Sequence, residues 1–210
     1  MAPRAPRPDR GARRPGGPPP GRRAGPAIRI DADGIASGAR FVPSPNFDER
    51  PAGSEISLLV VHGISLPPGD FGGDGVLELF TNTLDPAAHP AYEALGGLRV
   101  SAHFFLRRNG ELIQFVPCAR RAWHAGASAW RGRTRCNDFS IGIELEGADT
   151  VPYADLQYDR LARLVRALRR RYPIADAVGH SDIAPDRKTD PGPAFDWPRL
   201  RRLAAGRFRP

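Results

Sequence analysis

The apolar run at residues 56–61 constrains the fold of this chain more than any other segment. It reads Ile-Ser-Leu-Leu-Val-Val and is followed by His62 and Gly63. A short, continuous apolar run of this kind is typical of a central strand that is buried on both faces. Such a strand needs a covering layer on each side of its sheet, so the run favours an α/β domain.

The remaining patterns predict further strands and helices along the body of the chain. Asn109 and Gly110 separate two apolar segments, as in a tight hairpin. Leu and Val recur at helical spacing between Tyr153 and Tyr172, with arginines filling much of the rest. We expect strands at Val100–Leu106, Leu112–Val116 and Phe139–Leu145, and helices at Val76–Asn82, Tyr153–Tyr172 and from Asp196 to about Ala205. This order predicts a single α/β domain with a mixed central β-sheet flanked by helices.

The positive charge of the chain is concentrated at its N-terminus. Residues 1–30 contain eight Arg and one Asp, a net charge of +7 against +8 for the whole chain. A nucleic-acid-binding domain would show a basic face on its folded body, so we expect no specific nucleic-acid partner. Residues 1–38 are predicted to form a disordered tail before a folded domain at 39–210, because they are rich in Pro, Arg and Gly. Weak contact with RNA through charge and an inert extension both remain open for this tail.

Targeting signals and cysteines indicate the compartment. The arginines near the N-terminus are not followed by the apolar segment of a signal peptide, and no stretch approaches the ~20 apolar residues of a membrane span. Cys118 and Cys136 show no Cys-x-x-Cys spacing, and two reduced, buried thiols are favoured over one disulfide. We therefore expect a cytoplasmic monomer with no membrane partner.

Three residues have the chemistry of a catalytic zinc site. His62 and His180 each follow an apolar segment and adjoin a glycine, and Asp190 lies in a Pro/Gly-rich loop ten residues after His180. Two imidazoles and one carboxylate leave the fourth position of a tetrahedral zinc ion open for water. The spacing matches no compact zinc motif, so the residue types support zinc here and the spacing alone does not establish it.

A base and a cation complete the chemistry that such a site needs. Glu144 is the better candidate for the base, on the face of its strand opposite the apolar side chains, and Glu146 on the same face is its rival. A glutamate paired with one of the many arginines is the structural alternative. Lys188 is the only lysine beside 30 arginines, and its place between His180 and Asp190 favours a role in stabilising an oxyanion over that of an ordinary surface residue.

Several long stretches resemble a known family in sequence and in order. From about Arg40 to Leu203 the chain is similar to the amidase_2 family, and within it to the cytosolic amidases of bacterial cell-wall recycling. The stretches that carry the resemblance are VPSPNFDERP, SLLVVHGISLPPGDFGG, LFTNTLDPAAHP, LRVSAHFFLRRNGELIQFVP, RAWHAGAS, GRTRCNDFSIGIELEG and GHSDIAPDRKTDPGPAFDW. The resemblance implies the fold that this family shares with peptidoglycan recognition proteins and the phage T7 type of lysozyme.

The same resemblance implies roles for individual residues. It maps one zinc ion per chain onto His62, His180 and Asp190, the acid/base role onto Glu144 and the oxyanion-stabilising role onto Lys188. It also implies four substrate contacts, at Arg99, Trp123, His124 and Arg135. One position departs from the family pattern, since Gly63 stands where an Asn is expected after the first zinc ligand. We expect this glycine to change the affinity for the sugar.

The resemblance implies a zinc-dependent N-acetylmuramoyl-L-alanine amidase. The enzyme would hydrolyse the amide between the lactyl group of 1,6-anhydro-N-acetylmuramic acid and the L-alanine of the stem peptide, with an anhydro-muropeptide as its partner. A non-catalytic module that binds peptidoglycan fragments is the first alternative, and it is disfavoured because the candidate ligands, Glu144 and Lys188 are all present. An exported amidase acting on the intact cell wall is the second.

Overall fold

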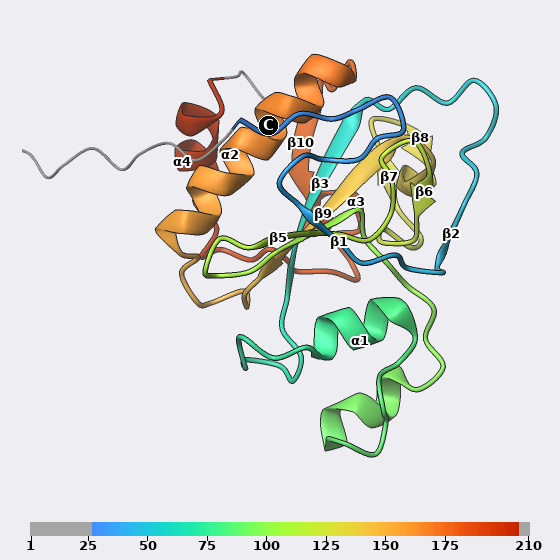
Figure 1. Ribbon diagram of the computed structural model, residues 1–210, viewed down its shortest axis with the longest axis vertical. Helices are drawn as coiled ribbons and strands as arrows, with labels where there is room; N and C mark the ends of the chain where they lie inside the picture. The colour runs from blue at the N-terminus through green and yellow to red at the C-terminus, as the bar shows by residue number, and fades with distance from the viewer. Residues whose placement is uncertain (1–26, 206–210) are drawn as a thin grey trace, which may run out of the picture.

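The computed structural model describes residues 27–205, and its centre is a six-stranded mixed sheet (Figure 1). β3 pairs in parallel with β9 on one side and β10 on the other, β9 pairs in parallel with β4, and β4 is antiparallel to β5. In spatial order the strands are β1 (Arg40–Phe41), β5 (Leu112–Gln114), β4 (Phe104–Leu106), β9 (Ser140–Glu146), β3 (Leu58–Ile64) and β10 (Asp176–Gly179). The prediction of a mixed central sheet is confirmed.

The central strands β3 and β9 are buried on both faces, as the apolar run predicted. Leu59, Val60 and Val61 are completely buried, and every residue of β9 is buried. Successive side chains of a strand point to opposite faces. Leu59 and Val61 therefore pack into a cluster with helix α2, whereas Leu58 and Val60 pack into a separate cluster on the other face.

Helices cover both faces of the sheet. α2 (Asp155–Arg171) and α4 (Trp197–Leu203) pack together on one face, and Figure 1 shows α1 (Gly75–Thr81) well apart from them. On the other face Phe80 of α1 packs edge-on against Phe115 at a ring distance of 5.1 Å, and α3 (His180–Ile183) packs beside β10. The helices expected at 76–82, 153–172 and after Asp196 are confirmed within one or two residues at most ends.

Smaller elements connect these layers. Gly110 has a φ of +86° in the turn between β4 and β5, as expected for an Asn-Gly hairpin, but both strands are shorter than predicted. The small elements are β2 (Phe47–Asp48) with β6 (Arg121–Ala122), β7 (Ala129–Trp130) with β8 (Arg133–Thr134), and the 3-10 helices η1 (Pro90–Leu95) and η2 (Cys136–Asp138). Cys118 and Cys136 are buried free thiols, as predicted. Between residues 27 and 205 no helix is long and apolar enough to cross a membrane.

The folded domain begins earlier than the predicted boundary at residue 39. Residues 1–26 of the predicted tail lie outside the described residues, but residues 27–38 pack on the domain. Ile28 and Ala36 are each 2% exposed and belong to the main hydrophobic cluster. Gln114 accepts a hydrogen bond from the backbone N–H of Ala36 and donates one to the carbonyl of Gly34, both at 2.8 Å. The prediction that all of residues 1–38 form a disordered tail is therefore wrong for residues 27–38.

We predict that a chain starting at residue 39 unfolds more easily than one starting at residue 27, since it lacks Ile28 and the backbone partners of Gln114. Removing one buried Ile side chain typically costs about 2–5 kcal/mol. Urea unfolding of the two proteins measures the difference. Within the longer protein, Ile28→Ala should reproduce much of the loss, whereas Asp33→Ala at an exposed position should not. Equal midpoints for the two truncations would show that residues 27–38 add no stability.

Candidate metal and active site

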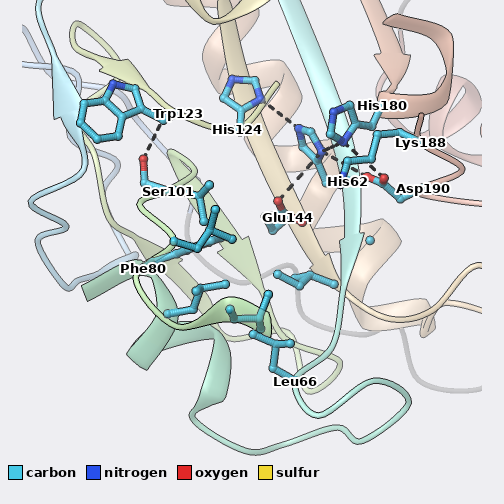
Figure 2. Close-up of a pocket in the computed structure, with 16 residues that line it drawn as sticks. His62, Leu66, Phe80, Ser101, Trp123, His124, Glu144, His180, Lys188 and Asp190 are labelled. Atoms are coloured by element: carbon cyan, nitrogen blue, oxygen red, sulfur yellow. Dashed lines mark hydrogen bonds and ion pairs between the residues drawn. The ribbon is translucent and has the colours of Figure 1, made fainter. Parts of the chain in front are cut away.

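The site lies in a cavity of about 240 Å³ (Figure 2). His62 and Glu144 line it and alternate along their strands with residues that pack against α2, so the cavity is on the opposite face of the sheet. One end of the cavity is polar and contains the predicted metal ligands together with Glu144 and Lys188. The other end is apolar, and its walls come from the loop after β3, from α1, from the end of η1 and from the segment after it, with Leu66, Leu79, Phe80, Leu95, Leu98 and Val100. The cavity therefore presents charged chemistry beside an apolar surface, an arrangement common in small-molecule sites.

Parallel pairing of β3 with β10 brings the two histidines together. Gly179 lies opposite Val61 in the register, so the residues that follow them, His180 and His62, emerge at the same edge of the sheet. The carboxyl ends of parallel strands are where α/β folds usually place their ligands. Asp190 arrives from the loop after α3, and its carbonyl accepts a hydrogen bond of 3.0 Å from the N–H of Ser181.

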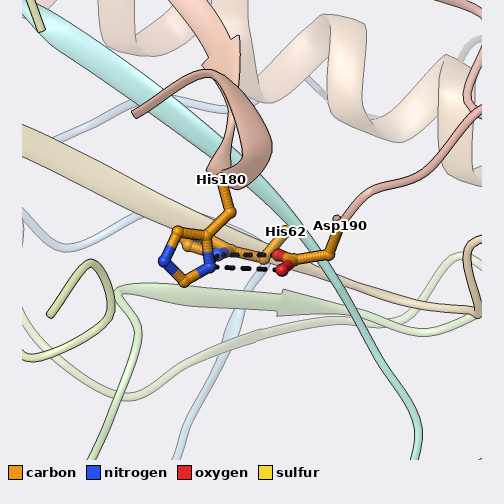
Figure 3. A group of neighbouring side chains, drawn as sticks. All are labelled: His62, His180 and Asp190. Atoms are coloured by element: carbon orange, nitrogen blue, oxygen red, sulfur yellow. Dashed lines mark hydrogen bonds and ion pairs between the residues drawn. The ribbon is translucent and has the colours of Figure 1, made fainter. Parts of the chain in front are cut away.

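The three side chains converge on one point (Figure 3). The Nδ1 atoms of His62 and His180 lie 3.0 Å apart, and the two Asp190 carboxylate oxygens lie 3.2 Å from His62 Nδ1 and 3.3 Å from His180 Nδ1. Tetrahedral zinc, with bonds of about 2.0–2.1 Å, would place its ligand atoms about 3.3 Å apart. The geometry and chemistry of these residues therefore fit a divalent metal ion.

The electrostatics of His62 and Asp190 also suit a metal. Burial lowers the pKa of His62 to about 4, although the neighbouring Asp190 carboxylate opposes the shift. Burial disfavours ionisation of Asp190, but hydrogen bonds from His180 and His62 outweigh it and hold the pKa of this carboxyl well below its usual range. A neutral imidazole and an ionised carboxylate are the forms that bind a metal, so neither His62 nor Asp190 has to change its protonation state to bind one near neutral pH.

Glu144 and Glu146 have different surroundings, although both project from the same face of β9. Glu144 pairs with His62 in the register between β9 and β3, and its Oε1 lies 4.0 Å from His62 Nδ1. Burial and the nearby Asp190 charge raise the pKa of Glu144 well above its ordinary value, while Lys188 opposes the shift. Glu146 instead accepts hydrogen bonds from the N–H groups of Gly72 and Arg108, at 2.6 and 2.9 Å. Glu144 faces the cavity, and Glu146 holds two loops.

Lys188 reaches the same cavity from the loop before Asp190. Within residues 27–205 no carboxylate oxygen lies within 4.0 Å of its ammonium, so this cation is not neutralised by a salt bridge. Its charge still acts on both Glu144 and His62. An unpaired ammonium beside a metal site is suited to stabilising negative charge on a substrate.

The structure divides the four predicted substrate contacts into two pairs. Trp123 and His124 line the cavity. Arg99 and Arg135 do not line it: Arg99 is exposed between two residues that do, and the guanidinium of Arg135 pairs with Asp138 at 3.1 Å. His124 is only 9% exposed, and its Nδ1 lies 2.9 Å from Nε2 of His62, behind the metal site.

Gly63 allows a buried tyrosine to approach the strand. A Cβ at this position would overlap the hydroxyl of Tyr153, which donates a hydrogen bond of 3.0 Å to the carbonyl of Pro191, next to Asp190. A side chain at residue 63 would therefore have to displace this hydroxyl. The glycine at position 63, where the family pattern has Asn, thus leaves room for the tyrosine that holds the loop of Asp190. The sequence did not suggest this role.

The apolar wall formed by α1 was missed by reasoning from sequence. Leu79 and Phe80 both line the cavity while packing on the sheet with Val76. Their helical spacing indicates an ordinary core-facing surface, and no local signal distinguishes a residue that also borders a cavity.

The fold and the site together define a class, an α/β domain with a His/His/Asp group that could hold a metal beside a buried glutamate. Residues 52–193 match the family described as N-acetylmuramoyl-L-alanine amidase, Amidase_2. The chain belongs to this family, as the resemblance implied.

Comparison with individual proteins agrees. The chain is 62% identical over 169 residues to the 1,6-anhydro-N-acetylmuramyl-L-alanine amidase AmpD of Salmonella typhimurium strain SL1344, which covers 80% of this chain and 90% of that protein. A crystal structure of selenomethionine AmpD has 59% identity and a TM-score of 0.80, covering 81% and 97% of the two chains. Escherichia coli AmiD in complex with anhydro-N-acetylmuramic acid-L-Ala-D-γ-Glu-L-Lys has 31% identity and a TM-score of 0.51, covering 84% and 65%.

We predict that metal-free protein loses stability as pH rises, relative to its Glu144→Gln variant. Above the ordinary pKa of a glutamate the unfolded chain releases the Glu144 proton, while the folded protein keeps it up to the raised pKa. Unfolding therefore releases a proton in this range, and rising pH favours the unfolded state. Urea unfolding in chelator between pH 4 and pH 8 measures the trend. Parallel curves for the two proteins would contradict it, and Glu55→Gln, at an exposed glutamate, controls for the change of net charge.

Proposed function

We propose that this chain is a zinc-dependent amidase that acts in peptidoglycan recycling. It hydrolyses the amide bond between the lactyl group of 1,6-anhydro-N-acetylmuramic acid and the L-alanine of the stem peptide. The observation that carries this proposal is the convergence of His62, His180 and Asp190, at the separations of tetrahedral zinc ligands, beside the buried carboxyl of Glu144. The 62% identity to an amidase named for this substrate supports it.

The residues of the site divide the chemistry among them. Zinc, when bound, would polarise the lactyl carbonyl and lower the pKa of a water molecule. Glu144 accepts the proton of the attacking water and passes it to the departing amine of L-alanine, a transfer that its raised pKa favours. The Lys188 ammonium stabilises the oxyanion that develops on the carbonyl oxygen. The products are the anhydromuramyl sugar and a free stem peptide.

The cavity supports a muropeptide as the substrate. Its apolar end and the indole of Trp123 on its wall offer surfaces for the sugar ring, and its polar end holds the reacting groups. Arg99 and Arg135, exposed outside the cavity, remain proposed contacts for carboxylate or carbonyl oxygens of a stem peptide that extends beyond it. Escherichia coli AmiD, 31% identical, binds an anhydromuramyl tripeptide. We propose that the protein works on such fragments as a cytoplasmic monomer.

The proposal is tested by mass spectrometry of the products from an anhydro-muropeptide. We predict that the wild-type protein releases the anhydromuramyl sugar and the intact peptide, that a chelator stops the reaction and that Zn²⁺ restores it. Glu144→Gln should lower turnover by about 100- to 10,000-fold, the usual contribution of a general acid–base group, with near-normal zinc content. Binding of the muropeptide without cleavage would identify a non-catalytic binding module instead.

Glu146→Gln is the matched control, because it changes the same residue type two positions away on the same face. Glutamine keeps one oxygen acceptor but replaces the other with an NH₂ donor, so one of the loop N–H groups of Gly72 and Arg108 loses its acceptor. The substitution should therefore lower the unfolding midpoint more than turnover. A larger loss of turnover in Glu146→Gln than in Glu144→Gln, with both variants folded, would reverse the assignment.

We predict that Lys188 cannot be replaced by arginine. If a compact ammonium must reach a small oxyanion, the wider planar guanidinium fits poorly. Lys188→Arg should lower turnover by about 10-fold or more and Lys188→Ala by about 100-fold or more, comparable to the loss of one oxyanion donor. Zinc content, measured on the same samples, should stay near normal. Normal turnover of the arginine variant would show that only the charge is needed.

A further inference from the structure

The two candidate histidine ligands direct their outer nitrogens at consecutive residues of one segment. Both use Nδ1 toward the metal position, which leaves Nε2 for a second partner. Nε2 of His62 lies 2.9 Å from Nδ1 of His124, and Nε2 of His180 lies 3.2 Å from the carbonyl oxygen of Ala125. Residues 124–125 therefore touch both histidines from behind.

This two-residue segment is itself held in place by several groups. The side-chain carbonyl of Asn137 accepts hydrogen bonds from the N–H groups of His124 and Ala125, at 3.1 and 2.8 Å. The His124 ring packs directly on Gly142 of β9, where a Cβ would overlap the ring. Its Nε2 lies 3.2 Å from the hydroxyl of Ser140. The ring is thus fixed on three sides by backbone, by strand β9 and by a hydroxyl.

The direction of these hydrogen bonds depends on which nitrogen of His62 binds metal. An imidazole that binds through Nδ1 carries its proton on Nε2 and must donate there. His124 can accept this proton's hydrogen bond on Nδ1 only if its own proton is on Nε2, and from there it donates to Ser140. If His124 Nδ1 donated to His62 Nε2 instead, the proton of His62 would be on Nδ1 and would block the metal position. The Ser140 hydroxyl can accept or donate a hydrogen bond, so it can accept from His124 Nε2 when His62 binds a metal through Nδ1.

We infer that His124 is a positioning residue for the metal site, which accepts a hydrogen bond from His62 Nε2 and so fixes the tautomer and ring orientation of this ligand. The carbonyl of Ala125 does the same for His180. His124 reaches the cavity with only 9% of its surface exposed, and both of its ring nitrogens have protein partners. Its main role is therefore toward His62 rather than toward the substrate.

Affinity for Zn²⁺ tests this inference, using the full chain stripped of metal and titrated in competition with a chromophoric chelator. His124→Leu keeps the bulk but removes the acceptor, and should weaken zinc binding by about 10- to 100-fold, as outer-shell changes typically do. His124→Asn places a carbonyl oxygen close to the position of Nδ1 and should recover most of the affinity. Ser140→Ala and Gly142→Ala should each weaken binding without touching a ligand, which keeps the test decisive if His124→Leu does not fold.

His103→Leu is the matched control. His103 is completely buried, its ring lies 5.8 Å from that of His124, and its nitrogens bond to Gly142, Arg50 and Arg120 rather than to a candidate ligand. Equal zinc affinity of wild type and folded His124→Leu would overturn the inference, as would an equal loss in His103→Leu.

The inference rests on the ligand roles proposed above. Different results would contradict the ligand assignment and the role of His124. A wild-type protein that binds no zinc would defeat the ligand assignment itself. A wild-type protein that binds zinc while the His124, Ser140 and Gly142 variants bind it equally well would defeat only the role of His124. A raised KM for muropeptide in His124→Leu with unchanged zinc affinity would make His124 a substrate contact and would also overturn it.

Discussion

The site depends on the parallel pairing of β3 with its two neighbours. This register sets His62 opposite Glu144 on one side, and Val61 opposite Gly179, just before His180, on the other. Because the strands are buried on both faces, a slip by one residue would turn apolar side chains to the wrong cluster, so the core specifies the register strongly. The hydrophobic packing that forms the sheet therefore also sets the positions of the reacting groups.

Placing several titratable side chains in this core is costly, and hydrogen bonds offset the cost. His62, His124 and His180 are nearly buried, and each has a partner for both ring nitrogens among its neighbours. The cost is not offset in this way for Glu144, because its surroundings raise its pKa and favour the protonated form. A buried carboxyl without groups that stabilise its ionised form destabilises the fold at neutral pH, but it is suited to accepting and donating a proton. The same burial thus serves function at some expense of stability.

Reasoning from sequence succeeded where a local pattern carries the information. The apolar run before His62 specified the central strand, and helical periodicity specified α2. It favoured Glu144 over Glu146 but could not show how their surroundings differ, because both lie on one face of a strand and only tertiary packing gives them different partners. Nor could it show that His124 lies behind His62, since these residues meet only through the pairing of distant strands. Ile28 was missed because its short apolar segment directly follows a Pro/Arg/Gly-rich stretch, although the turn at Asp31–Gly34 was a readable signal.

The loop that follows α3 explains why three ligands from distant parts of the chain can form one rigid site. Asp190 is held by its carbonyl, which accepts from Ser181 close to His180, and its neighbour Pro191 is held by the hydroxyl of Tyr153 at the start of the α2 region. Tyr153 in turn needs the open space at Gly63, directly after His62. The position of Asp190 therefore depends, through Tyr153, on the strand that carries His62. A residue without a side chain at position 63 lets the strand, the start of the helix and the loop meet. The reason for a glycine beside the candidate ligand His62 is therefore space for Tyr153, and not backbone flexibility.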